Sequence, residues 1–186
     1  MRSKLAAVLV ASALGLSGAA AQSPRQLAQA APAQPNTPER TAATYGDWVL
    51  RCDQAGAGRV CEISQTIQAQ LPNGQTAAVA QVAMGRLQKS EPLRVTVVIP
   101  PNVTLTAPVK FSPEDKDGAP TIDLSWQRCL AQGCFASATL NEDMLKRLRA
   151  RTEPGRLQVK DGQNRDVNLA FSTRGFAAAL AALPND

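Results

Sequence analysis

Short stretches in which hydrophobic and polar residues alternate recur along residues 45–183, and turn-forming residues separate them. A period of two is typical of a β-strand that buries one face and exposes the other. This period is clear at residues 48–53, 93–99, 103–111 and 122–127, and further strands are predicted at residues 60–67, 76–87, 157–160 and 167–172. Pro108 marks its stretch as an edge or irregular strand. Many short strands separated by turns predict a mainly β fold, an antiparallel sandwich or barrel.

The clearest strand pair lies around residues 122–138. Apolar residues alternate up to Trp126, and Cys129 and Cys134 then bracket a short turn that contains Gly133. The alternation resumes after this turn. The pattern predicts a hairpin that a disulfide closes at its turn.

Two short helices are predicted between the strands. Thr139 and Glu142 have the spacing of a capping box, and the apolar residues after them form one stripe at helical spacing. A proline and a glycine within residues 153–155 end this helix. A second helix is predicted at residues 176–183, and because it is short and rich in alanine it needs to pack on the sheet.

Residues 1–21 have the pattern of an export signal. Arg2 and Lys4 precede an apolar run at residues 5–16, and the alanines at 19–21 form a cleavage site before Gln22. The apolar run is too short to cross a hydrocarbon core of about 30 Å. We therefore expect no transmembrane segment after signal removal, and a protein that is periplasmic, secreted or displayed at the cell surface.

Residues 22–44 differ in composition from the rest of the chain. They are rich in alanine, glutamine and proline and contain few large apolar residues. Such a segment buries too little apolar surface to offset the entropy of ordering, so we predict a disordered linker. Residues 45–183 are then predicted to form one domain, an antiparallel sandwich or barrel.

The four cysteines predict two structural disulfides, because exported proteins fold in oxidising compartments. Cys52 with Cys61, and Cys129 with Cys134, would each join neighbouring strands across one predicted turn. Crossed pairings remain open. A redox pair and a zinc site are disfavoured, because neither spacing is that of a thioredoxin or a zinc knuckle.

The charge of the chain is mildly basic. The formal charge is +5, to which Arg2 and Lys4 of the export signal contribute two. This is far from the asymmetry of a nucleic-acid-binding protein. Basic residues concentrate only near the first helix, at Lys146, Arg147, Arg149, Arg151 and Arg156. Lys146, Arg147, Arg149 and Arg151 form a candidate patch for an anionic partner, although a solvated helix face explains them as well.

No motif for catalysis, a cofactor or a metal emerges. The chain has no histidine, which removes the common nucleophile-activating and metal-binding groups. Residues 115–118 resemble the start of a calcium loop, but Trp126 occupies the position of its closing glutamate. Paired carboxylates could support a glycan hydrolase. The available groups are Asp47, Asp53, Glu62 and Asp123.

Several short motifs lie along the chain: Gly46-Asp47-Trp48, Arg51-Cys52-Asp53, Cys61-Glu62, Trp126-Gln127-Arg128-Cys129 with Gly133-Cys134-Phe135, and Gly175-Phe176 with Ala179-Leu180. Together they resemble the invasion-associated locus B family of alphaproteobacteria. Residues 93–105 also resemble the apolar strand pair in the middle of the family. The resemblance implies an exported, immunoglobulin-like β-sandwich and, in pathogenic members, a role in host-cell invasion. It implies no catalytic residue.

These observations favour a non-enzymatic interaction module of the cell envelope or surface, without a cofactor. Its partner would be an envelope or external protein or polysaccharide, not a nucleic acid. One alternative is the carboxylate-dependent envelope glycan hydrolase. Another is a structural or stress-protective periplasmic protein without a specific ligand.

Overall fold

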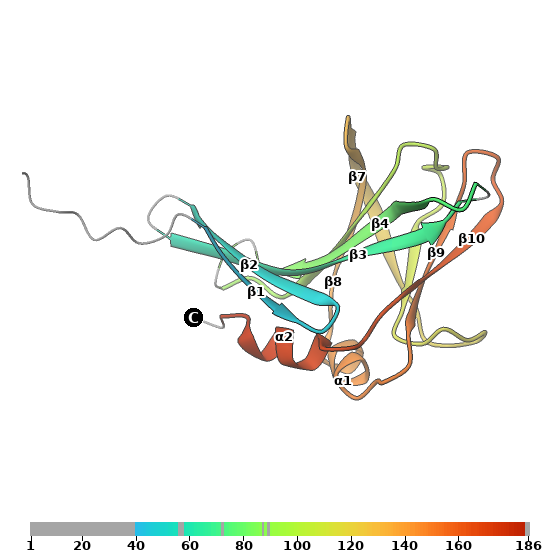
Figure 1. The fold of residues 1–186 in the computed structure, drawn as a ribbon. Helices are drawn as coiled ribbons and strands as arrows, with labels where there is room; N and C mark the ends of the chain where they lie inside the picture. The colour runs from blue at the N-terminus through green and yellow to red at the C-terminus, as the bar shows by residue number, and fades with distance from the viewer. Residues whose placement is uncertain (1–39, 56–57, 72, 87, 89, 185–186) are drawn as a thin grey trace, which may run out of the picture. The chain divides into compact units, whose positions relative to one another are not determined.

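Every pair of neighbouring strands in the described residues is antiparallel (Figure 1). The structure, a computed structural model, describes residues 40–55, 58–71, 73–86, 88 and 90–184. The predicted export signal and residues 22–39 of the predicted linker lie outside these ranges. The strands are β1 (Arg40–Tyr45), β2 (Trp48–Ala55), β3 (Gly58–Gln70), β4 (Thr76–Gly85), β5 (Arg94–Ile99), β6 (Val109–Ser112), β7 (Ile122–Leu130), β8 (Gly133–Thr139), β9 (Gly155–Lys160) and β10 (Asp166–Phe171).

The strands form two packed layers that are joined through β7. Their order is β1-β2-β3-β4-β5-β8-β7-β6-β9-β10. The first half of β7 pairs with β6 and its second half pairs with β8, so this strand passes from one layer to the other. Val97 of β5 and Phe111 of β6 belong to the same hydrophobic core. The predicted mainly β sandwich with two short helices and two disulfides is confirmed.

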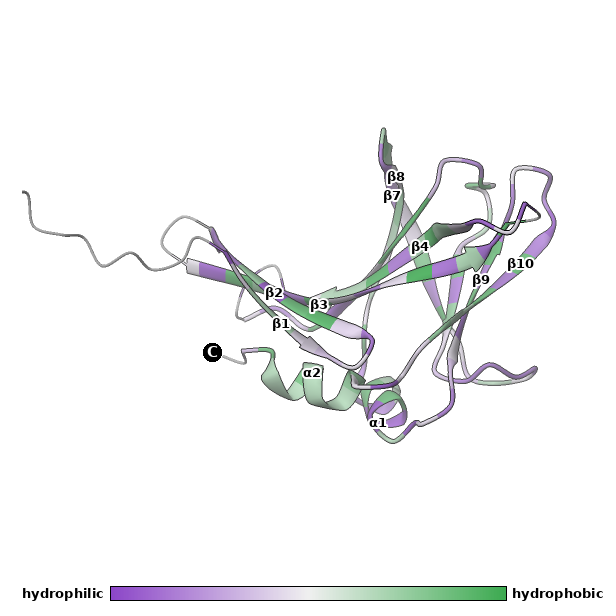
Figure 2. Ribbon diagram, viewed as in Figure 1, coloured by the Kyte–Doolittle hydropathy of each residue, from purple (hydrophilic) through white to green (hydrophobic). Residues whose placement is uncertain are grey.

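The alternation in the sequence decides which side of each strand faces the core. On β3, Ile63 and Ile67 are buried, whereas Glu62 and Thr66, which point to the other face, are exposed. Hydrophobic and hydrophilic positions alternate along the neighbouring strands in the same way (Figure 2). Burial of one apolar face per strand is the main source of stability for such a fold.

The helices α1 (Glu142–Arg149) and α2 (Phe176–Ala182) lie below the β1–β4 part of the sheet in Figure 1. Met144, Leu145 and Leu148 of α1 and Phe176 and Leu180 of α2 are buried, so both helices pack on the core. No helix in the described part of the chain is both long and apolar enough to cross a membrane.

The start of α1 differs from the prediction. The N-cap is Asn141, whose side chain accepts a hydrogen bond from the backbone N–H of Met144 at 2.8 Å. Thr139 instead ends β8. The predicted capping box was wrong because asparagine is an equally good cap and lies nearer to the buried stripe.

The predicted boundary between linker and domain at residue 44 was also wrong. Residues 40–44 belong to β1, which pairs along its whole length with β2. Most of its side chains are exposed, so the strand is held by backbone hydrogen bonds and leaves no hydrophobic pattern. Residues 103–108 also lack a regular strand, and Val103 makes only an isolated bridge with Asp161.

Candidate binding site

The two ends of the described chain meet at a junction between the β1–β2 turn and the turn before α2. Gly46 and Gly175 both have positive φ angles, 58° and 83°. A Cβ atom on Gly175 would overlap the backbone of Tyr45, so only glycine allows this approach. Trp48 and Phe176 pack edge to face, with ring centres 5.1 Å apart.

An ion pair covers this junction. Arg174 Nε donates to Asp47 Oδ2 at 3.0 Å, and its Nη2 donates to the other carboxylate oxygen. Hydrogen bonds from Arg174 and then Ser172 lower the pKa of Asp47 to about 2. The motifs Gly46-Asp47-Trp48 and Gly175-Phe176 are therefore in contact, and their visible role is to hold the fold together.

The carboxylates considered for hydrolysis are engaged at separate places. Asp47 pairs with Arg174, Asp53 pairs with Arg40, and Asp123 pairs with Lys110. Of these four carboxylates, only Glu62 lines a hollow that also contains arginines without an ion pair in the described residues. Glu62 is also the only acidic side chain among the described residues of that lining.

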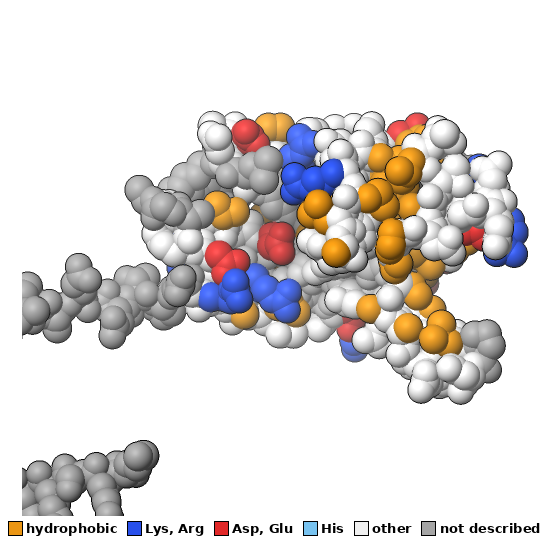
Figure 3. Space-filling model, turned by 90° about the horizontal axis from the view of Figure 1, so that it is seen from above, with side chains coloured by type: hydrophobic (Ala, Val, Ile, Leu, Met, Phe, Trp, Pro, Cys, Tyr) orange, Lys and Arg blue, Asp and Glu red, His pale blue; other side chains and the backbone are white. Residues whose placement is uncertain are grey.

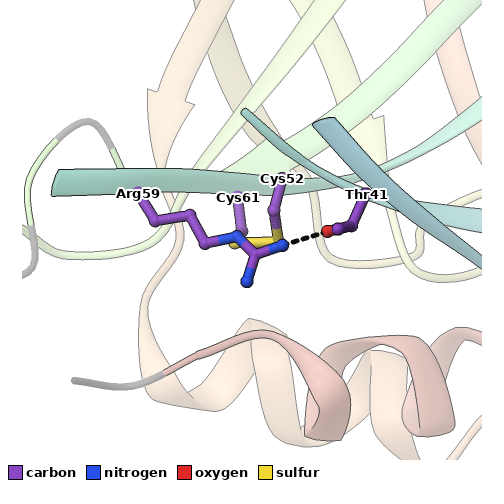
Figure 4. The surroundings of a disulfide bond; sticks show 4 residues. All are labelled: Thr41, Cys52, Arg59 and Cys61. Carbon is purple, nitrogen blue, oxygen red and sulfur yellow. Dashed lines mark hydrogen bonds between the residues drawn. A yellow bond between two sulfur atoms is a disulfide. The ribbon is translucent and has the colours of Figure 1, made fainter. Parts of the chain in front are cut away.

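Both disulfides join neighbouring strands, as favoured from the sequence. Cys52 and Cys61 are opposite each other on β2 and β3, with Cα atoms 4.0 Å apart. The side chain of Arg59 runs past this bond and donates a hydrogen bond to Thr41 of β1 (Figure 4). Cys129 and Cys134 join β7 to β8, with Cα atoms 3.9 Å apart.

The four residues of the predicted basic patch differ in their exposure and in their contacts. Lys146, Arg147 and Arg149 are exposed on α1. Arg151 forms an ion pair with Glu114, whose side chain is only 8% exposed and which also pairs with Lys116 at 2.7 Å. Hydrogen bonds from Lys116 and Arg151 lower the pKa of Glu114. Arg151 thus stabilises the fold, and binding by the other three residues stays a prediction.

A hollow of about 530 Å³ lies on the side of the sheet that faces away from the helices. Its lining comes from β3, β4, β5, β7 and β8. In Figure 1 the β7–β8 hairpin rises beside this face. Figure 3 shows the same side with acidic side chains between two groups of basic side chains and a nearby stripe of hydrophobic side chains.

The strand register explains why the surface is hollow here. One row across the sheet consists of Arg51, Glu62, Gly85 and Arg94. The next row consists of Ser64, Ala83, Thr96 and Ser137. A third row consists of Thr66, Gln81, Val98, Phe135 and Arg128. The middle row has only small side chains, so it forms a low floor between two rows with long side chains.

The charged groups at the hollow have few partners within the chain. In the described residues, no side chain forms an ion pair or hydrogen bond with the carboxylate of Glu62. Glu62 is exposed overall, but neighbouring atoms partly shield its carboxylate from water, which raises its pKa, and the charge of the nearby Arg51 opposes this effect. Arg94 Nη2 donates to Ser137 Oγ at 3.1 Å, which holds its guanidinium over the floor.

The comparisons with known proteins agree with the motifs. The family model described as Invasion associated locus B (IalB) protein matches residues 48–184. The chain belongs to this family. Among curated proteins, none matches this IalB family member in sequence.

The fold of this IalB family member is similar to a solved structure. The crystal structure of invasion associated protein B from Bartonella henselae matches it with a TM-score of 0.61 and 18% sequence identity. The match covers 76% of this chain and 92% of the Bartonella chain. At this identity the likeness concerns the fold.

Sequence reasoning did not identify the hollow of this IalB family member. Arg94 and Thr96 occupy the polar positions of an alternating strand, and Arg128 follows Trp126 within the family motif. These residues looked like ordinary solvent-facing positions. They become a site only when β5, β8 and β7 are placed side by side.

Proposed function

We propose that this chain is an exported, non-enzymatic interaction module of the cell envelope or surface, and that it binds its partner at the hollow. The observation that carries the proposal is the arrangement of Arg86, Arg94 and Arg128 with Glu62 around a low floor. None of these four side chains forms an ion pair within the described residues. Charged groups concentrated on a concave surface without internal partners are available to an external partner.

Export is part of this proposal. It is supported by the two disulfides, which persist in oxidising compartments, and by the pattern of residues 1–21. We expect the protein in the periplasmic or culture fraction, with an N-terminus at or near Gln22. N-terminal sequencing of the fractionated protein tests this. Recovery in the cytoplasm with Met1 retained would contradict it.

A role in contact with partners agrees with the names of the relatives. The family and the Bartonella protein are both named for an association with invasion. We propose for this chain a broader function, which is contact with an envelope or external component.

The geometry argues against the hydrolase alternative. Paired carboxylates act from opposite sides of one glycosidic bond, about 5–10 Å apart. Asp47, Asp53 and Asp123 are each held by a cation at a different place in the fold. Replacing each of the four carboxylates by its amide, followed by assays on envelope glycans, tests this view. Turnover that depends on a carboxylate would contradict the proposal.

Site-specific photocrosslinking in cells tests the binding module directly. A photoreactive residue at Gln81, which lines the hollow, should yield a discrete crosslinked product. The same residue at Ala178, which is exposed on α2, should not yield it. The substitution Ala83→Leu, which fills the floor, should abolish the product, whereas Ala178→Leu should leave it unchanged. Repeated absence of a product at Gln81 would instead favour a structural or stress-protective protein.

A further inference from the structure

The hollow continues into a second hollow along the strands. The second one has a volume of about 430 Å³, and both are lined by Gln81, Val98 and Phe135. We call the combined surface the face groove. Along β4 it runs from Gly85 to Ala78, which is about 20 Å at the rise of a strand.

The two ends of the face groove differ in chemistry. Arg86, Arg94 and Glu62 lie at one end. Ala78 and Pro100 lie at the other end. With Arg128 on its side wall, the described lining has three arginines and one glutamate, so it attracts negative charge. A ligand that matches this surface is elongated, anionic at one end and apolar at the other.

The wall of the face groove argues against a sugar ligand. Sugars commonly stack on an exposed aromatic face, and Phe135 is the aromatic residue among the described lining. The guanidinium carbon of Arg128 lies 5.6 Å from the centre of the Phe135 ring, so a cation covers that face. The same contact holds the Arg128 guanidinium at the wall of the groove.

The polar groups of the face groove fit a peptide. Arginine binds carboxylates through paired hydrogen bonds, and the hydrogen bond to Ser137 leaves further donors of Arg94 available. Gln81 and Gln132 place amide groups along the groove, which can donate to and accept from a peptide backbone. A length of about 20 Å accommodates about six residues of an extended chain.

We propose that the face groove binds an extended peptide segment of a partner protein, with carboxylate side chains at the Arg86–Arg94 end and small apolar side chains at the Ala78–Pro100 end. This inference rests on the proposed function, because it assigns a ligand class to the same site.

Selection from a library of random eight-residue peptides on the full-length chain, with both disulfides oxidised, tests the ligand class. The enriched peptides should carry aspartate or glutamate near one end and small apolar residues near the other. Replacement of the acidic residues by their amides in the best synthetic peptide should weaken binding about tenfold or more, since each charged hydrogen bond contributes strongly. Binding should also weaken as salt is raised.

Two matched double variants locate the site. Arg86→Gln with Arg94→Gln should weaken binding of the selected peptide at least about tenfold. Lys110→Gln with Lys160→Gln removes the same charge from β6 and β9, which do not line the face groove, and should change it less than about twofold. Circular dichroism and thermal unfolding should show that both variants fold like the original chain.

Several outcomes would overturn the inference. They are enrichment without acidic residues, equal loss of binding in the Lys110–Lys160 variant, and failure to select any peptide. Arginine-dependent binding of alginate or of phosphatidylglycerol vesicles in place of peptides would assign the face groove to a polysaccharide or a lipid surface. If photocrosslinking at Gln81 still captures a partner in these cases, the proposed function stands and only the ligand class is wrong.

Discussion

Gly175 allows a tertiary contact because glycine has no Cβ atom. Its φ of 83° and its approach to the backbone of Tyr45 together bring the turn before α2 against the β1–β2 turn. The two effects can be separated, because Gly74 also has a positive φ, 79°, but has open space around its Cα.

We therefore expect Gly175→Ala to destabilise the protein far more than Gly74→Ala. The change at Gly74 should lower the free energy of unfolding by about 1 kcal/mol, which is the cost of the left-handed conformation. The change at Gly175 should lower it by more than about 3 kcal/mol, because the backbone must also move. Urea unfolding followed by tryptophan fluorescence measures both. Equal effects would show that the contact with Tyr45 is unimportant.

The Asp47–Arg174 ion pair predicts a dependence of stability on pH. The pKa of Asp47 is lowered from 3.8 to about 2 in the fold, so its contribution is present above pH 4 and is lost as the pH falls through about 2. Because Arg174 is 76% exposed, solvent screens the pair and we expect Asp47→Asn to cost only about 1 kcal/mol at pH 7. The difference from the original chain should vanish near pH 2.

Asp123→Asn is a suitable control for this measurement. Asp123 also pairs with a cation, Lys110, but its side chain is 54% exposed and joins two adjacent strands. We expect a change below about 0.5 kcal/mol. A difference between Asp47→Asn and the original chain that persists at pH 2 would mean that the asparagine disturbs the junction itself.

At the scale of elements, the β7–β8 hairpin connects the disulfide with the face groove. Cys129 and Cys134 lie next to the pair formed by Arg128 and Phe135 in the ladder. The bond therefore fixes the strand segment that carries the groove wall.

Replacing Cys129 and Cys134 by serine should lower the free energy of unfolding by about 2 kcal/mol on the loop-entropy estimate. It should leave the Cys52–Cys61 bond intact, which non-reducing peptide mapping can show. The corresponding change at Cys52 and Cys61 should cost a similar amount. The Cys129–Cys134 variant should also weaken binding at the face groove, and unchanged binding in this variant would contradict the role of the hairpin.

Sequence reasoning found the elements whose contacts are between residues that lie close together in the sequence. In residues 122–138 the alternation, the turn and the cysteine spacing all concern neighbours along the chain. β1 was missed because it stabilises the sheet edge through its backbone and buries little. The cap of α1 was misplaced by two residues because both Thr139 and Asn141 are chemically suitable.

The face groove could not be predicted for a different reason. It depends on the register that places Glu62, Gly85 and Arg94 in one row, and on β8 lying between β5 and β7. The order of strands far apart in the sequence is a property of the whole fold. The carboxylates were visible in the sequence, but their cations, such as Arg174 for Asp47, are distant along the chain.

At the scale of the whole molecule, the hydrophobic core includes the last described helix. Phe176, Leu180 and Leu183 are buried, and Phe176 contacts Trp48. Burial of each large apolar side chain contributes about 2 kcal/mol, so their joint loss is comparable to the net stability of a small domain, which is about 5–15 kcal/mol.

We expect a chain that ends at Thr173 to remain unfolded. Its Trp48 should be exposed to solvent, with red-shifted fluorescence and no cooperative unfolding transition. A chain that ends at Pro184 should fold like the full-length protein, since it keeps every described buried residue. Cooperative unfolding of the shorter chain would show that α2 is an accessory element.

The contact between Asp47 and Arg174, 127 residues apart, also sets an order in time. The partner of the first turn is among the last parts of the domain to leave the ribosome. Until then the growing chain lacks part of its hydrophobic core, so we expect it to remain unfolded. If the chain is exported as we propose, this delay is useful, because only an extended chain fits through a narrow translocation channel. Under the proposed export, the junction would close only after translocation, in a compartment where the cysteines can also be oxidised.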